Sequence, residues 1–131
     1  MKLIRSFCFY GAMIAMPLFV NTAWSVEPIN FEVRNNADLV AVCATQPSDP
    51  NYVAAIHFCH GFAVGYYRYY ESLMREGKFF NPIFCIPDGV TRNQAVSAFV
   101  SFSKAHPDYD QALVGDAVMK FLVETYPCKS K

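Results

Sequence analysis

The fold is decided by residues 57–73, HFCHGFAVGYYRYYESL. Apolar and aromatic side chains recur in this stretch at steps of three and four residues, which is the period of one face of an α-helix. The same period begins at Asn51, after a loop rich in proline and aspartate, and continues to Glu76 and Gly77. We therefore predict one long helix from Asn51 to about Glu76.

Two further helices are marked by their starting residues. Asn35 or Asn36 can cap a short helix that runs to about Cys43. Thr91 and Gln94 have the spacing of a capping box, in which each side chain bonds to the backbone of the other residue. This pattern predicts the start of a third helix at about residue 91.

A final helix follows a very short connection. The third helix is expected to stop before His106, and Pro107 is suited to the first turn of a last helix that ends before Pro127. No alternating apolar run is long enough for a sheet. The fold class is therefore predicted as all-α, a small four- to five-helix bundle stapled by disulfides.

The N-terminal segment has the pattern of a secretory signal peptide. Lys2 and Arg5 precede an uncharged apolar run over residues 7–20, and Ala23 and Ser25 occupy the small positions that a signal peptidase needs. We predict a signal peptide over residues 1–25, cleaved after Ser25, and a helical domain over residues 26–131. The apolar run is shorter than the ~20 residues of a membrane span, so no membrane association is expected after cleavage.

The charge balance excludes one class of partner. The chain has 11 basic and 11 acidic residues, and cleavage would remove two of the basic ones. Neither a basic stripe nor an arginine cluster remains, so nucleic acid is not an expected partner.

Four cysteines remain after the predicted cleavage, Cys43, Cys59, Cys85 and Cys128. An even number in a small exported domain indicates two disulfides, for which three pairings exist. The short connection predicts that the third and fourth helices are antiparallel, which would place Cys85 and Cys128 at the same end. This arrangement favours a Cys85–Cys128 bond and leaves Cys43 for Cys59.

The histidines around Cys59 raise the question of a metal or nucleophile site. His57 and His60 are one helical turn apart, but a zinc site needs three or four ligands, and an oxidised Cys59 is neither a ligand nor a thiolate nucleophile. No other catalytic arrangement stands out. We expect no enzyme activity, no metal and no cofactor.

Gly61 and Gly65 each cost a helix up to about 1 kcal/mol relative to alanine. Their four-residue spacing, with Ala54 on the same face, indicates that another backbone passes close by. We expect a neighbouring helix of the same chain there, with a helix of a second copy as the alternative.

The tyrosine run covers more than one face of the long helix, so its members cannot all point into one core. Tyrosine and arginine are enriched at protein interfaces. The predicted interface residues are Tyr67, Arg68, Tyr70, Arg75, Phe79, Phe80 and Asn81.

The order of these features resembles a known family. It comprises Cys43, the FCHGF sequence at residues 58–62, Gly65, the CIPDGVT sequence at residues 85–91 with Gln94, the His106–Pro107 pair, and YPC at residues 126–128. The pattern is similar to the Rap/Tai family of immunity proteins, which protect bacteria from amidase effectors of type VI secretion. The C-x-P-x-G-V-T-x-x-Q block and the terminal YPC are its more specific parts.

The resemblance implies a periplasmic, disulfide-stapled, helical and typically dimeric protein without catalysis, which binds a peptidoglycan amidase and blocks its cleft. It carries over no interface residues. Two other functions are compatible with the sequence, namely a periplasmic holdase or acid-stress chaperone, and a structural or ligand-binding module with a pocket under residues 79–84.

Overall fold

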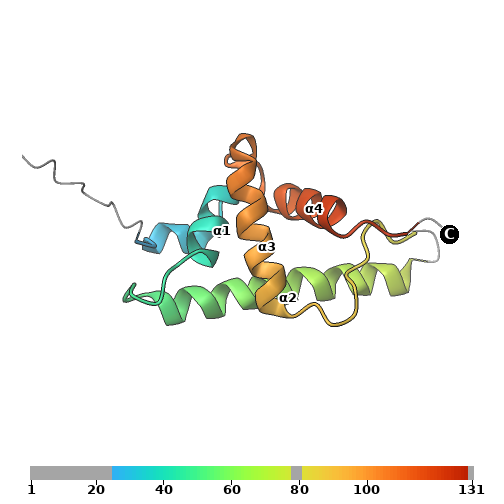
Figure 1. The fold of residues 1–131 in the computed structure, drawn as a ribbon, viewed down its shortest axis with the longest axis horizontal. Helices are drawn as coiled ribbons and strands as arrows, with labels where there is room; N and C mark the ends of the chain where they lie inside the picture. The colour runs from blue at the N-terminus through green and yellow to red at the C-terminus, as the bar shows by residue number, and fades with distance from the viewer. Residues whose placement is uncertain (1–24, 78–80, 130–131) are drawn as a thin grey trace, which may run out of the picture.

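The computed structural model describes residues 25–77 and 81–129, and the predicted signal peptide lies almost entirely outside them. Four α-helices and two short 3-10 helices occur in this part of the chain, without a strand, which confirms the all-α fold (Figure 1). In chain order they are η1 (Pro28–Glu32), α1 (Asn36–Cys43), α2 (Tyr52–Glu76), α3 (Arg92–Ala105), η2 (Pro107–Tyr109) and α4 (Val114–Thr125).

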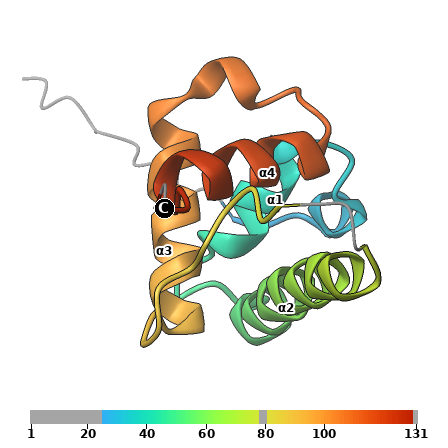
Figure 2. The same ribbon diagram turned by 90° about the vertical axis from the view of Figure 1, so that its right-hand side faces the viewer.

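The long helix α2 forms one side of the molecule. It is 25 residues long, and its buried residues Ala55, Cys59 and Tyr70 lie on the face predicted from the period of the sequence. Figures 1 and 2 show α1, α3 and α4 gathered on this one side of α2. The opposite face of α2 is therefore not covered by any other helix of the described chain.

The core is made by residues from every α-helix and from the segment before α3. The most deeply buried large side chains include Leu39 and Val42 of α1, Cys59 of α2, Phe84, Phe99 of α3 and Phe121 of α4. Phe84 stacks on Tyr70, with ring centroids 4.1 Å apart, and Tyr70 Oη accepts a hydrogen bond from the Ile83 N–H at 3.0 Å. Phe84 thus packs onto the helices, whereas Ile83 beside it is half exposed.

The start of α3 is as predicted and the start of α4 is not. Thr91 and Gln94 form the capping box. Pro107, however, opens only the three-residue helix η2, and α4 begins at Val114. The carbonyls that would continue a helix from Pro107 bind elsewhere: Asp110 O accepts the Ala37 N–H at 3.0 Å and Ala112 O accepts the Asn36 N–H at 3.1 Å.

The prediction that α3 and α4 are antiparallel is also wrong, because α3 is upright in both views whereas α4 runs sideways (Figures 1 and 2). The disulfide pairing is nevertheless confirmed, with Cα–Cα distances of 5.2 Å for Cys43–Cys59 and 4.8 Å for Cys85–Cys128. The non-helical segment before α3 brings Cys85 to the end of α4, where its N–H donates to Tyr126 O at 2.7 Å.

A buried carboxylate holds the N-terminal end of α1. Asp38 is only 4% exposed. It accepts hydrogen bonds from the Arg34 guanidinium at 2.9 and 3.1 Å, from the Arg34 backbone N–H at 3.1 Å, and from Asn30 Nδ2 at 2.9 Å. The N-cap Asn35 accepts the Asp38 N–H at 3.0 Å. Hydrogen bonds from Arg34 hold the pKa of the Asp38 carboxyl below its usual range, against the opposing effect of burial.

The Cys85–Cys128 bond is expected to stabilise the fold mainly by restricting the unfolded chain, since it closes a loop of 43 residues. Replacing both cysteines with serine should lower the free energy of unfolding by about 4 kcal/mol on the chain-entropy model. Urea denaturation of the oxidised wild type and of the double variant measures this difference. A loss below about 1 kcal/mol would contradict the expected contribution.

The lowered pKa of Asp38 makes the free energy of unfolding depend on pH in the acidic range. Its contribution is fully present above the unfolded value of about 3.9 and is lost as the pH falls through the lower folded pKa. The wild type should therefore lose more stability between pH 5 and pH 2.5 than Asp38→Asn, measured as urea midpoints. Asp108→Asn, at an exposed position, is the control, and its urea midpoint should change with pH as that of the wild type does. If the urea midpoints of the wild type and Asp38→Asn fall equally between pH 5 and pH 2.5, the Asp38 carboxylate does not stabilise the fold in this way.

Candidate functional site

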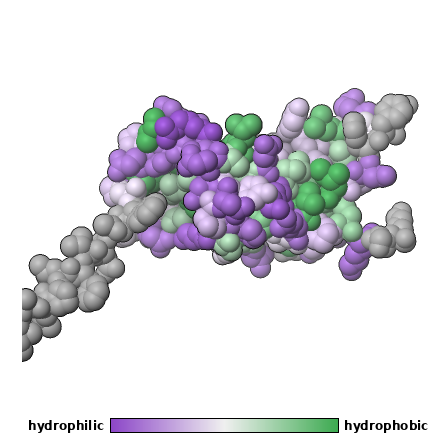
Figure 3. Space-filling view, turned by 90° about the horizontal axis from the view of Figure 1, so that it is seen from above, coloured by the Kyte–Doolittle hydropathy of each residue, from purple (hydrophilic) through white to green (hydrophobic). Residues whose placement is uncertain are grey.

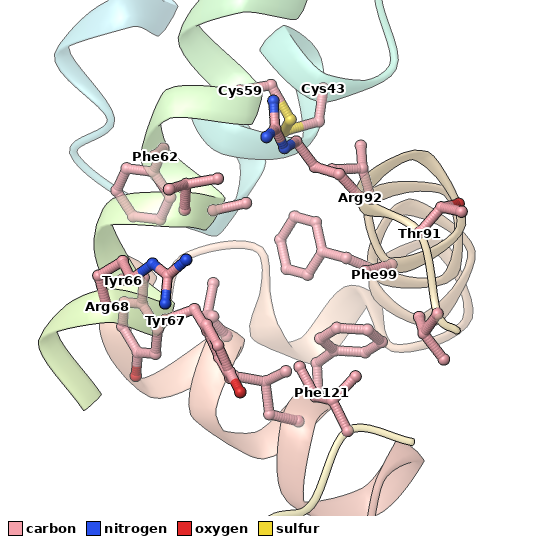
Figure 4. A pocket seen from close by; sticks show the side chains of 18 of the residues that line it. Cys43, Cys59, Phe62, Tyr66, Tyr67, Arg68, Thr91, Arg92, Phe99 and Phe121 are labelled. Carbon is pink, nitrogen blue, oxygen red and sulfur yellow. A yellow bond between two sulfur atoms is a disulfide. The ribbon is translucent and has the colours of Figure 1, made fainter. Parts of the chain in front are cut away.

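A cavity of about 430 Å³ opens between α2, the segment over residues 86–91, α3 and α4 (Figure 4). We call it the α2–α3 groove. The Cys43–Cys59 disulfide lies at one end of it, and Tyr67 of α2 extends toward Phe121 of α4, across the cavity from Phe99 of α3. Because five separate parts of the chain line it, no single sequence motif indicates the groove.

The polar residues of the groove lie at its edge. Arg68 comes from α2 and is ion-paired with Glu71 at 2.6 Å, and Arg92 is the first residue of α3. Thr91 and Asp88 lie beside Arg92 in the chain and also line the groove. The groove therefore combines an apolar interior with a rim on which two guanidinium groups are placed.

The tyrosines of α2 divide between the groove and the core. Tyr67 lines the groove and is half-buried, and this burial raises the pKa of its hydroxyl. Tyr66 is also half-buried, and its hydroxyl donates to Gly115 O at 3.0 Å. Tyr70 is buried beneath Phe84, so the prediction that it forms an interface is wrong. Instead Tyr69, absent from the predicted interface, is 66% exposed.

Gly61 and Gly65 lie on the outer, exposed face of α2. A Cβ atom added to either glycine would meet nothing within 4 Å. The expected close contact with a neighbouring helix of the same chain is therefore wrong for the described residues, because the other helices pack on the opposite face. Contact with a second copy stays a prediction.

The remaining predicted interface residues lie near the C-terminal end of α2. Arg75 and Asn81 are exposed, and the predicted Phe79 and Phe80 lie outside the described residues. Leu73 and Ile83, nearby in the chain, are 45% and 50% exposed. Figure 3 shows apolar side chains interrupting the polar surface, with the larger patches toward the end away from the N-terminal segment.

The histidines of α2 do not form a chemical site with their neighbours. His57 is exposed, whereas His60 Nε2 is buried without a hydrogen-bond partner. Burial lowers the pKa of His60, and the nearby positive charge of Arg92 lowers it further. Within residues 25–77 and 81–129, no three His, Cys, Asp or Glu side chains are grouped so as to hold a metal ion. In the same residues, no helix combines the length and the apolar character that crossing a membrane requires.

These features define the class as a small, disulfide-stapled helical protein with an apolar groove and exposed aromatic and basic side chains. The model of the Rap1a immunity proteins matches residues 35–128, from the N-cap of α1 to the last disulfide cysteine. The chain belongs to this family of immunity proteins. Neither a curated protein nor a solved structure matches it significantly. Membership implies that the protein binds a cognate effector and is not an enzyme.

Proposed function

We propose that this protein is exported to the periplasm, where it binds and inhibits a peptidoglycan amidase that a type VI secretion system delivers. The family match carries the proposal, because it spans all four α-helices and both disulfides. Disulfides are typical of exported proteins, and the signal-peptide pattern over residues 1–25 agrees with this location.

The proposed contact surface lies on the C-terminal half of α2 and the residues after it. Arg68 and Arg75 are exposed about two helical turns apart, and Tyr69 presents most of its ring to solvent. Large aromatic and arginine side chains at the centre of an interface commonly carry most of the binding energy. Half-buried Tyr67 and exposed Asn81 extend this surface.

Titration calorimetry with a purified type VI peptidoglycan amidase from the bacterium that carries this gene tests the proposal. We expect saturable stoichiometric binding, loss of amidase activity, and about thirtyfold weaker binding for Tyr69→Ala combined with Arg68→Ala, a fold-change typical of a hot spot. Lys104→Ala, at an exposed position in the last turn of α3, is the matched control and should bind like the wild type. Absence of binding by the wild type would overturn the function, and unchanged binding by the double variant would overturn the surface.

We further propose a homodimer formed through the outer face of α2, where Gly61 and Gly65 allow two helices to approach closely. Alanine at both positions should stabilise an isolated helix, by up to about 1 kcal/mol each. Leucine at both positions should keep the fold, because both positions are exposed and a Cβ atom there meets no atom of the described chain within 4 Å.

Sedimentation equilibrium of Gly61→Leu combined with Gly65→Leu tests this dimer. We expect the dimer dissociation constant to rise at least tenfold, while the circular dichroism spectrum stays that of the wild type. A wild type that remains monomeric at 100 μM, or a variant that dimerises like the wild type, would contradict the dimer.

A further inference from the structure

The interior of the α2–α3 groove is made by the core of the protein itself. Its floor includes Leu39, Cys59, Phe99 and Phe121, none of which is more than 5% exposed. These buried side chains lie beneath the groove, and the accessible lining above them includes the half-buried side chains of Phe62, Ala63, Tyr67 and Ile86. A ligand lying there would contact mainly the apolar carbon of these half-buried side chains, and it would meet charged groups at the rim, where Arg68, Asp88 and Arg92 are exposed.

This distribution of polar groups restricts the chemistry of the ligand. A sugar, a nucleotide or a peptide backbone would bury donors and acceptors against the apolar floor, and each unpaired group costs roughly 1–3 kcal/mol. Only the part of a ligand that stays at the rim can be polar. The occupant must accordingly be apolar along most of its length.

The volume of the groove favours an extended acyl chain over a single aromatic ring as the occupant. A cavity of roughly 150 Å³ is large enough for benzene, which is close in size to a phenylalanine ring. The groove, at about 430 Å³, is nearly three times as large and lies within the range of sites that bind small molecules. One inserted aromatic side chain of a partner would leave most of it unfilled, whereas an extended acyl chain can follow its length.

The rim selects the charge of the other end of the ligand. Arg92 extends from α3 toward α2, and Arg68 lies on the α2 side of the cavity (Figure 4). Arg68 is ion-paired with Glu71. Within residues 25–77 and 81–129, Arg92 forms no ion pair. A guanidinium group binds carboxylates and other oxyanions strongly, so the rim fits an anionic headgroup in spite of Asp88 nearby.

We propose that the α2–α3 groove binds a single-chain amphiphile with an anionic headgroup, the chemistry of a long-chain fatty acid. The acyl chain lies along half-buried apolar side chains of the groove, which include Phe62, Ala63 and Ile86, and the carboxylate is held at the rim by Arg92 with a contribution from Arg68. This site shares Tyr67 and Arg68 with the surface proposed to contact the amidase, but binding of the amphiphile does not depend on inhibition of an amidase.

Calorimetric titration of the oxidised mature chain with dodecanoate, below its micellar concentration, tests the site. We expect one saturable site per chain, with affinity falling about fourfold for each methylene removed when decanoate and octanoate replace dodecanoate. Dodecyltrimethylammonium, which has the same chain and the opposite charge, should bind at least tenfold more weakly.

Three variants locate the binding. Ala95→Trp places an indole in the groove from α3 and should abolish binding of dodecanoate. Arg92→Glu should lower the affinity for dodecanoate at least tenfold. Lys104→Glu removes another exposed cation of α3 that does not line the groove, and it should leave the affinity unchanged. Circular dichroism checks that each variant is folded, and if Ala95→Trp is not, Ala63→Trp on the α2 wall replaces it.

The proposal is overturned if dodecanoate gives no saturable heat, if the cationic amphiphile binds equally well, or if the folded groove-filling variant still binds. It is also overturned if dodecanoate does not bind while Ala95→Trp abolishes binding of the amidase, because the groove would then hold part of a protein partner.

Discussion

The disulfide between Cys43 and Cys59 fixes the element on which the other helices pack. Helix α1 has only eight residues, which is too short for a stable isolated helix in water, yet it contacts α2, α3 and α4. The bond joins the last residue of α1 to a residue in the first half of α2 that is 1% exposed. A short central helix can hold this position because one end of it is covalently tied to the longest helix.

The other end of α1 is held by polar groups. The buried Asp38 joins this end to Arg34 and Asn30, and the N–H groups of Asn36 and Ala37 bind carbonyls of the loop between η2 and α4. These bonds satisfy donors that a helix start leaves unpaired. They also explain why α3 and α4 are not antiparallel, since the loop between them is used to cap α1. The floor of the groove, formed partly by α1, is fixed by the same interactions.

Features that depend on local sequence could be predicted, and features that depend on distant contacts could not. The period of α2 and the capping box at Thr91 follow from spacing and residue type. The disulfide pairing is correct although the antiparallel helices from which it was predicted are absent, because the segment before α3 brings Cys85 to the end of α4. The failure at Pro107 has a tertiary cause, because its local pattern suits a helix start while α1 binds the carbonyls that follow. Gly61 was misassigned because glycine has no side chain to show which face is buried. The groove could not be predicted at all, since its walls meet only after folding.

The residues that hold the fold together differ from the residues that we propose to contact a partner. Disulfides, caps and the core fix the inner face of α2, and the contact surface that we propose lies on the exposed side of the C-terminal half of the same helix. Backbone hydrogen exchange of the protein, measured with and without saturating cognate amidase, tests this separation most directly. The account predicts slower exchange in residues 64–77 and unchanged rates in α3 and α4. Unchanged rates in residues 64–77, or slowing confined to α3 and α4, would contradict it.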